Sequence, residues 1–302
     1  MNVKDYAKGT ERLVSPMSVG KVHYLQTKLA RLPVCIQRKL VTSSAKKSGK
    51  MPFVVEPYCF FLFYEIPDPA KIQKFLPEGF APAASAIFEG DPEKLYGIVS
   101  MFRIHTSVFW GARAEYYLVA KNTATGLLSW AMMDYISDTI SYDEKHGLKS
   151  PDASHAVMTT TCEGEFICDM KTADGRKYVE CEASLKKAKM RPLNQRLWIE
   201  GNTSIAYGRL AGEPDGDLFS LTFMPEEMTE ALDVPLSSVT KARAAARTGT
   251  LGAKLAGAAC FPYAQHMLSD APGTHTHYGS ESALRTAAEN INFRHLKGFG
   301  EK

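Results

Sequence analysis

The sequence of 302 residues contains no run of eighteen or more apolar residues, although 45% of its residues are hydrophobic. A helix that crosses a bilayer needs about 20 such residues, so no membrane-spanning helix is expected. The first residues, MNVKDYAKGTERL, do not join a charged segment to an apolar stretch, so a secretory signal is not expected either. These two absences predict a globular protein of the cytoplasm.

The cysteines form no C-x-x-C pair, which argues against a zinc knuckle and against a thioredoxin-like motif. Several lie inside apolar runs, as Cys59 does in YCFFLFY. We expect reduced thiols that mostly serve as small core residues. The six are Cys35, Cys59, Cys162, Cys168, Cys181 and Cys260.

Motifs for cofactors and hydrolase chemistry are also missing. There is no G-x-S-x-G elbow, and TGTLGAKLAG (248–257) has neither the spacing of a phosphate loop nor that of a dinucleotide fingerprint. His275 and His277 are two imidazoles on one face of an extended segment, but no further ligand follows at a useful interval. The sequence therefore predicts no metal and no cofactor.

Acidic residues are scarce at the N-terminal end. Residues 1–50 hold eleven Lys or Arg and two Asp or Glu, whereas the remainder of the chain has a balance of −6. A basic arm of this kind can bind nucleic acid or an anionic membrane, pack on another subunit, or stay solvated. Nucleic acid is not expected, because the arm has no aromatic interleaving and no Arg-rich block. We treat 1–50 as a basic N-terminal extension and 51–302 as a single domain.

From residue 52 the chain is rich in short aromatic and branched runs separated by turn signals. This pattern predicts a mainly β fold with flanking helices, built as an antiparallel barrel or sandwich. TADGRK (172–177) carries the D-G signal of a tight hairpin. The strands are expected at 53–66, 84–90, 95–105, 114–121, 156–171, 177–187, 196–210 and 217–224.

Four segments have helical signals. Apolar residues recur at helical spacing in 22–32, and 68–80 has Asp68 as N-cap followed by a proline. A helix is also expected from about Trp130, since AMMDYISDTISYDEK lacks glycine and proline and Gly147 suits a C-cap. The Ala-rich stretch 240–260 is interpreted as a helical insertion appended to the domain.

The stretch SYDEKHG (141–147) holds the strongest candidate nucleophile, Lys145. An amine attacks a carbonyl only when it is neutral, so burial or a nearby cation must lower its pKa by several units. His146 is one such cation, whereas Asp143 and Glu144 act in the opposite direction. The alternative is a solvated helix end, where the helix dipole favours a lysine.

Glu115 is a second candidate, because it is a charged residue in the apolar run AEYYLVAK. With Arg113 it could face the interior of a barrel, or it could mark an exposed strand end. Tyr116 and Trp130 could line a ligand site, although as core residues they need no such role.

Four stretches, in order, resemble the acetoacetate decarboxylase-like family. They are FLFYEIPDPAKIQKFLPEGFAP (61–82), RAEYYLVAKNTATGLLSWAMMDYISDTISYDEKHG (113–147), RPLN (191–194) and FSLTFMPEEMTEALDVPLSSV (219–239). The resemblance covers roughly 55–240. It implies a closed or cone-like β-barrel with an apolar interior, built as a homo-oligomer.

For activity, the resemblance implies chemistry without metal or organic cofactor. In the family's decarboxylases a lysine forms a Schiff base with a β-keto acid, and the iminium accepts the electrons when carbon dioxide leaves. Relatives use the same imine for aldol and dehydration chemistry. The family's Y-P-K-K-x-G is met here by Y-D-E-K-H-G: Tyr142 and Gly147 match, Glu144 stands at the imine-forming lysine and Lys145 at the second lysine. A one-residue slip would return Lys145 to the reactive position; without it the imine lysine is missing.

We therefore expect a lyase-like enzyme for a keto acid or a bulkier polyketide- or terpenoid-like carbonyl compound. Lys145 is the expected imine former or general base, with Glu144, His146 and Glu115 as further catalytic groups. The expected substrate-binding residues are Arg113, Arg191, Tyr116, Trp130 and Tyr142. Two alternatives stay open: a non-catalytic barrel that binds an apolar ligand, and a cofactor-free isomerase or hydratase that works without an imine.

Overall fold

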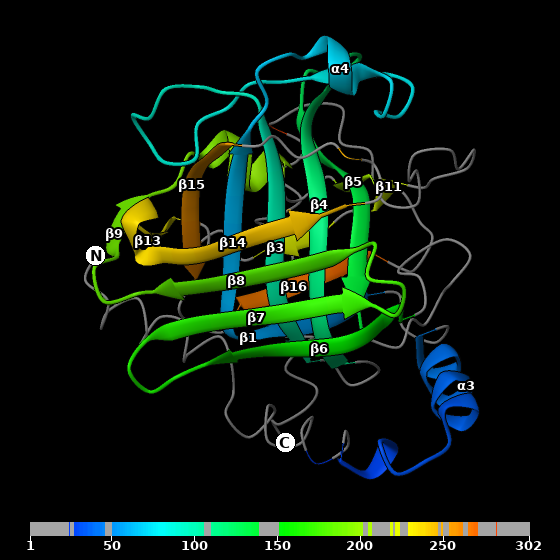
Figure 1. Ribbon diagram of the computed structural model, residues 1–302. Coiled ribbons are helices and arrows are strands. Elements are labelled where there is room, and N and C mark those ends of the chain that lie inside the picture. Colours follow the sequence, from blue (N-terminus) through cyan, green and yellow to red (C-terminus); the bar gives the residue numbers. More distant parts are fainter. Residues whose placement is uncertain are drawn as a thin grey trace.

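The computed structural model describes residues 24, 27–45, 50–105, 110–138, 151–201, 205–206, 218–219, 221–223, 229–246, 249, 254–261, 265–270 and 282. Two sheets dominate it, and the four-stranded sheet lies across the long upright strands of the larger one (Figure 1). The expected mainly β fold class with few helices is confirmed. Within the described part, no helix is long and apolar enough to cross a membrane.

The larger sheet has twelve strands and is antiparallel except where β10 runs parallel to β5. Its main path is β11-β10-β5-β4-β3-β1-β15-β13-β9, while β2, β12 and β16 pair off this path. The strands are β1 (Lys50–Glu65), β2 (Phe80–Pro82), β3 (Tyr96–His105), β4 (Trp110–Asn122), β5 (Leu128–Ser137), β9 (Lys189–Pro192), β10 (Ile205–Ala206), β11 (Leu218–Phe219), β12 (Leu221–Phe223), β13 (Glu230–Asp233), β15 (Lys254–Phe261) and β16 (Gln265–Asp270).

The smaller sheet has the order β14 (Val239–Ala245), β8 (Tyr178–Ser184), β7 (Glu165–Thr172) and β6 (Ala153–Thr160). One core fills the space between the two sheets. Phe60, Leu62 and Tyr64, alternate residues of β1, meet alternate side chains of β7 and β8 there. Phe60 and Phe166 stack with ring centroids 4.7 Å apart. This core fixes one face of the large sheet and leaves its other face for a different set of side chains.

The second core lies on that other face and is mostly aromatic. Phe61, Phe63, Trp130, Trp198 and Phe261 contact one another edge to face, with ring centroids 5.0–5.9 Å apart. Trp198 comes from η1 (Arg196–Gly201), a π-helical turn, and its Nε1 donates to the carbonyl of Ile87 at 2.8 Å. Such ring pairs add to area burial, so this face of the sheet is held rigidly.

The helical insertion expected at 240–260 is wrong: the chain forms β14 and β15 there. Alanine favours helices in isolation, but packing overrides this preference. β15 lies between β1 and β13 in the large sheet, where its small residues allow close approach. A Cβ added to Gly257 would clash with Cδ1 of Ile87, so a larger residue at that position would force the Ile87 side chain to move.

Two further expectations need correction. The segment from Trp130 to Ser137 belongs to strand β5, because both its faces are buried against other elements and its backbone pairs with β4. Met133 is an extra residue at a bulge in this pairing. The expected strand 196–210 instead begins with the π-helical turn η1, and among its described residues only Ile205 and Ala206 form a strand, β10.

Helices are few and short in the described chain. Those with bounds in the described chain are α3 (Val34–Ala45), α4 (Ala70–Gln73) and the 3-10 turn η3 (Leu236–Ser238), besides η1; residues 24, 27–29 and 282 are also helical. Asp68 precedes α4, and its carboxylate accepts a hydrogen bond from the backbone N–H of Ala70 at 3.0 Å. The D-G hairpin is confirmed: it joins β7 to β8, and Gly175 has a φ of 66°. The boundary between extension and domain near residue 50 stays a prediction.

Candidate functional site

Strand β4 carries charged side chains into the aromatic face of the large sheet. Successive side chains of a strand alternate between its faces. Tyr117 belongs to the aromatic core, whereas Ala114 and Tyr116 belong to the core between the sheets. Arg113 and Glu115 therefore lie on the aromatic face, both almost completely buried. The expected pair on this strand is internal and does not mark an exposed strand end.

The neighbouring strands add hydroxyl groups to the same place. Glu115 stands directly opposite Ser100 on β3 and Tyr135 on β5. In an antiparallel sheet, directly opposed side chains share a face and lie close together. Ser137 on β5 stands opposite Arg113. We call Ser100, Arg113, Glu115, Tyr117 and Ser137 the Glu115 cluster.

The carboxylate of Glu115 is held by a cation and by a phenol. Arg113 Nε donates to Glu115 Oε1 at 2.8 Å, and its Nη1 donates to Ser137 Oγ at 3.1 Å. The Tyr117 hydroxyl donates to Glu115 Oε2 in a short hydrogen bond. The exposed fractions of the Arg113 and Glu115 side chains are 1% and 2%. Both carboxylate oxygens therefore have defined donors inside the protein.

This arrangement is costly to build in an apolar core. Moving an ion out of water costs several kcal/mol, and the attraction within a buried pair often only offsets that cost. Apolar residues of similar volume would fill the same space at no electrostatic cost. A buried ion pair among tryptophan and phenylalanine rings is therefore a poor device for stability alone.

Two polar groups on the aromatic face have no hydrogen-bond partner among the described residues. Ser100 Oγ and Trp130 Nε1 are buried, and neither makes a hydrogen bond with any described residue. More than nine in ten buried polar groups in proteins are satisfied, so each exception calls for an explanation. Ser100 is the more informative, because its hydroxyl lies opposite the Glu115 carboxylate and can both donate and accept.

The segment that contains the candidate nucleophile joins the chain at this cluster. Ser137 and Asp152 exchange hydrogen bonds: Asp152 N–H donates to the Ser137 carbonyl, and Ser137 N–H donates to Asp152 Oδ1, both at 3.0 Å. Ser137 is also the acceptor for Arg113. The four predicted site residues in between, Tyr142, Glu144, Lys145 and His146, lie outside the described residues.

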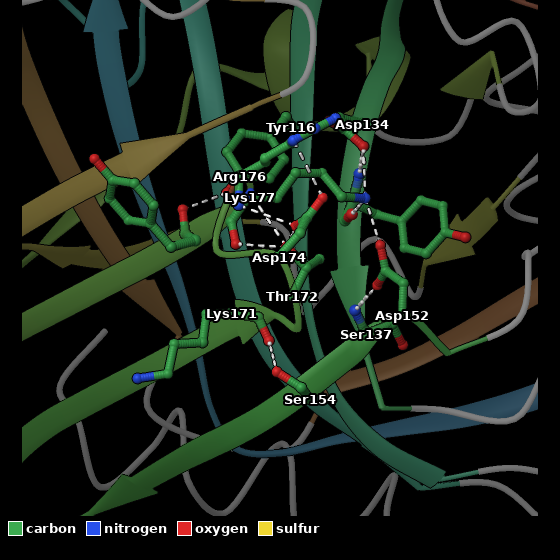
Figure 2. A network of polar contacts seen from close by, with 12 residues as sticks. Tyr116, Asp134, Ser137, Asp152, Ser154, Lys171, Thr172, Asp174, Arg176 and Lys177 are labelled. Carbon is green, nitrogen blue, oxygen red and sulfur yellow. Dashed lines mark hydrogen bonds and ion pairs between the residues drawn. The ribbon is translucent and has the colours of Figure 1, made fainter.

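Lys177, from the β7–β8 turn of the smaller sheet, binds the end of β5 (Figure 2). Its Nζ donates to Asp134 Oδ1 at 3.2 Å, to the Tyr135 carbonyl at 2.7 Å, and to Asp152 Oδ2 in a short contact. Sequence reasoning missed this lysine, because in TADGRK it is one of several polar residues of a hairpin turn. Only the packing of the two sheets brings it to β5.

Tyr135 lies between two cations. The guanidinium carbon of Arg113 and the Nζ of Lys177 are each 5.0 Å from the centroid of its ring. An aromatic face attracts a cation at this distance, so the ring couples the Lys177 network to the Glu115 cluster. The Lys177 network and the Glu115 cluster therefore form one connected arrangement at the end of β5.

Two predicted substrate-binding residues on β4 and β5 lie on different faces. Trp130 lies on the aromatic face, with its ring centroid 5.5 Å from that of Tyr117. Tyr116 points the other way, and its hydroxyl donates to the Tyr178 carbonyl at 2.9 Å. Burial raises the pKa of Tyr116 well above its ordinary value. Tyr116 therefore ties the two sheets together and is separated from the Glu115 cluster by β4 itself.

Arg191 is occupied by carboxylates of this chain. Its Nη2 donates to Asp91 Oδ1 at 2.7 Å and its Nη1 donates to Asp233 Oδ2 at 2.9 Å. Its guanidinium also lies 4.7 Å from the centre of the Phe88 ring. Hydrogen bonds from both carboxylates raise the pKa of Arg191. The structure thus gives Arg191 a bridging role between β9, β13 and the Asp91 loop.

In the part of the chain that the structure describes, no three His, Cys, Asp or Glu side chains are grouped so that they could hold a metal ion. His275 and His277 lie outside that part. Of the predicted site residues, the structure brings together Arg113, Glu115 and Trp130.

Comparison with known proteins gives neither a matching family model nor a matching curated relative. Solved structures do match. An acetoacetate decarboxylase from Legionella pneumophila shares 13% identity at a TM-score of 0.47, covering 75% of this chain and 87% of that one. An enduracididine biosynthesis enzyme, complexed with the condensation product of pyruvate and imidazole 4-carboxaldehyde, shares 12% identity at 0.46, covering 73% and 87%.

An acetoacetate decarboxylase-like enzyme from Sphingomonas wittichii shares 8% identity at a TM-score of 0.41, with 74% of this chain and 91% of that chain covered. Two of these three structures carry the name of the family that the sequence motifs resemble. At TM-scores below 0.5 and identities of 13% or less, the likeness assigns this chain neither an activity nor a substrate.

Proposed function

We propose that this protein is an enzyme that acts on a carbonyl compound at the Glu115 cluster, with lyase-type chemistry. The observation that carries the proposal is the unpartnered hydroxyl of Ser100 opposite a buried, doubly held carboxylate. Such a hydroxyl is satisfied when a ligand oxygen or nitrogen enters, and the carboxylate then lies next to the ligand. The substrate class proposed is a keto acid or a related carbonyl compound.

In this proposal Glu115 is the group that moves a proton. It can exchange one with a substrate next to Ser100, and the hydrogen bonds from Tyr117 and Arg113 hold its two oxygens in place. Ring packing and the ion pair fix the direction of its oxygens, so little reorganisation accompanies the reaction. Trp130 supplies an apolar wall and one indole donor.

Lys145 is the proposed covalent group. Its neutral amine attacks the substrate carbonyl, water leaves, and the resulting iminium takes up the electron pair of the bond that breaks at the neighbouring carbon. Protonation of that carbon and addition of water then release the product and restore the amine. Support for this role comes from the family resemblance, and from the fact that segment 139–150 joins the described chain beside Ser137, a member of the cluster.

Acid–base chemistry without an imine is the second candidate. One described contact favours acid–base chemistry: Glu115 and Tyr117 form a carboxylate–phenol pair that can exchange protons without any lysine. An isomerase or a hydratase would need this pair and a substrate carbonyl. The two candidates differ in whether a covalent intermediate forms.

Borohydride trapping distinguishes the two. The protein is incubated with 2- and 3-keto acids, reduced with borohydride and mapped by peptide mass spectrometry. Imine chemistry predicts one dominant reduced adduct, on Lys145, which Lys145→Arg abolishes. Lys186→Arg is the matched control, since that side chain is 57% exposed and pairs with Glu163 and Glu165 at the surface. Adducts spread over exposed lysines would contradict the proposed imine at Lys145. Acid–base chemistry at Glu115 and Tyr117 would then be the remaining candidate.

A further inference from the structure

The N-terminal helical region presents apolar side chains to the outside. Among the described residues, seven large hydrophobic side chains are exposed, and five of them lie between residues 24 and 40. Val34 is 55% exposed and Leu40 is 45% exposed. The five are Tyr24, Leu32, Val34, Ile36 and Leu40. We call them the N-terminal apolar patch. Exposed hydrophobic side chains are ordinarily scattered singly over a protein surface, so a group of five in one segment marks a contact surface.

The same region carries charge of one sign only. From residue 12 to residue 55 the sequence has nine Lys or Arg and no Asp or Glu. Exposed Lys28, Arg31 and Lys39 lie among the residues of the apolar patch. Lys28 Nζ is 5.2 Å from the centroid of the Tyr24 ring, so a cation and an apolar ring share one spot.

Helix α3 places the two kinds of residue side by side. Ile36 and Leu40 are four residues apart and therefore lie on one face of the helix. Lys39 precedes Leu40 and projects from the flank of that face by helical geometry. Gln37 is folded back, with its Nε2 donating to the Leu32 carbonyl at 2.7 Å, which fixes the start of α3 against the preceding turn. In Figure 1, α3 lies to the side of the two sheets.

We propose that residues 24–45 dock the protein on an anionic lipid surface. A helix with apolar residues on one face and only basic charges beside them is the pattern of an interfacial helix. A protein partner would ordinarily be met by charges of both signs, whereas a surface of anionic headgroups needs only cations. The absence of any acidic residue over 12–55 therefore favours lipid. Binding takes place at the interface plane and is independent of the proposed enzyme activity.

Vesicle sedimentation with the full chain tests this. Vesicles of equal parts phosphatidylcholine and phosphatidylserine are compared with phosphatidylcholine alone. We expect binding to the first and at least tenfold weaker binding to the second, with a loss of binding in high salt. Changing Lys28, Arg31 and Lys39 together to alanine lowers the partition coefficient roughly a hundredfold, since each basic residue contributes a factor of about five near an anionic surface.

The apolar contribution is tested by Ile36→Glu with Leu40→Glu, which we expect to abolish sedimentation. Leu236→Glu is the matched control, because Leu236 is 41% exposed but lies on η3, away from the N-terminal segment. Circular dichroism shows that each variant is folded. No binding by the parent protein, or equal binding to both vesicles, would overturn the proposal. So would a concentration-dependent dimer in vesicle-free solution that the double variant dissociates, because the patch would then bind a second copy.

Discussion

At the scale of single residues, the Ser100 hydroxyl is the group that distinguishes a ligand site from an ordinary protein core. Its hydroxyl is buried, opposes Glu115 and has no partner among the described residues. Ser137, on the next strand but one, is equally buried but accepts a hydrogen bond from Arg113. The two serines therefore differ in what each hydroxyl does in the unliganded protein, and they make a matched pair for mutation.

We expect Ser100→Ala to leave the free energy of unfolding within about 0.5 kcal/mol of the parent, because no hydrogen bond is lost. Ser137→Ala removes an acceptor of a buried guanidinium and should cost about 1–3 kcal/mol. Urea unfolding measures both. Turnover of a keto acid or its binding should fall at least tenfold in Ser100→Ala. If Ser100→Ala destabilises the protein as much as Ser137→Ala does, the hydroxyl is a structural group and the ligand site is lost from the account.

Part of the Glu115 cluster could be predicted from the sequence. Glu115 and Arg113 were detectable because charged residues interrupt an apolar strand, and β4 places both inward. Ser100, Tyr117 and Ser137 were not, because serine and tyrosine are ordinary in strands and only strand register brings them to Glu115. Arg191 was predicted to bind substrate, yet Asp91 and Asp233 bind it, from positions far apart in sequence.

At the scale of elements, β15 shows where local signals fail. Its alanines favour a helix, but the strand packs between β1 and β13, and Gly257 must accept Ile87 at close range. In contrast, β1, β3 and the β7–β8 hairpin were predictable, because β-branched and aromatic runs and a D-G turn act locally. What the sequence could not show is which neighbours each strand would meet, since that depends on long-range pairing.

The contact between Gly257 and Ile87 can be tested by a double-mutant cycle. Gly257→Ala adds a methyl group that meets Cδ1 of Ile87, so overpacking should cost about 1–3 kcal/mol. Ile87→Val removes that methyl and alone should cost about 0.5–1.5 kcal/mol. Together they should cost less than the sum, because each relieves the other. Urea unfolding of the four proteins gives the coupling; strict additivity would show that β15 does not approach Ile87.

At the scale of the whole molecule, the cysteines report on how closely the two cores are packed. Cys59, Cys168, Cys181 and Cys260 are buried, whereas Cys35 and Cys162 are exposed, and all six are free thiols. Burial raises the pKa of the four inner thiols, for Cys181 to about 12. The thiolate is the reactive form, so the inner four are both inaccessible and protonated at neutral pH.

Thiol titration with a chromogenic disulfide at pH 8 should therefore show two thiols reacting rapidly and four only on unfolding. The same shifts predict alkaline destabilisation. The native state keeps its four protons above the unfolded thiol pKa of about 8.5, whereas the unfolded chain releases them, so stability falls as pH rises from about 8.5 towards 12. Each such thiol lowers the free energy of unfolding by up to about 1.4 kcal/mol for every pH unit in that window. A stability that is flat from pH 8 to 10 would contradict the packing of both cores.

At this scale the rigid aromatic face encloses the Arg113–Glu115 ion pair, and segment 139–150 joins the described chain beside that pair. Lys177 contributes from the second sheet by holding Asp134 and Asp152, which places the end of β5. The two sheets thus have different tasks: the large one carries the Glu115 cluster, and the small one fixes the strand end from which segment 139–150 departs.

A crystal structure of the protein soaked with pyruvate tests the central claim most directly. The account predicts that an oxygen of the ligand lies within hydrogen-bond distance of Ser100 Oγ, with the ligand in contact with the Glu115 carboxylate and the Trp130 ring. A structure in which pyruvate binds elsewhere, while the space beside Ser100 is filled by side chains of the protein itself, would show that the Glu115 cluster is a polar core and not a site of reaction.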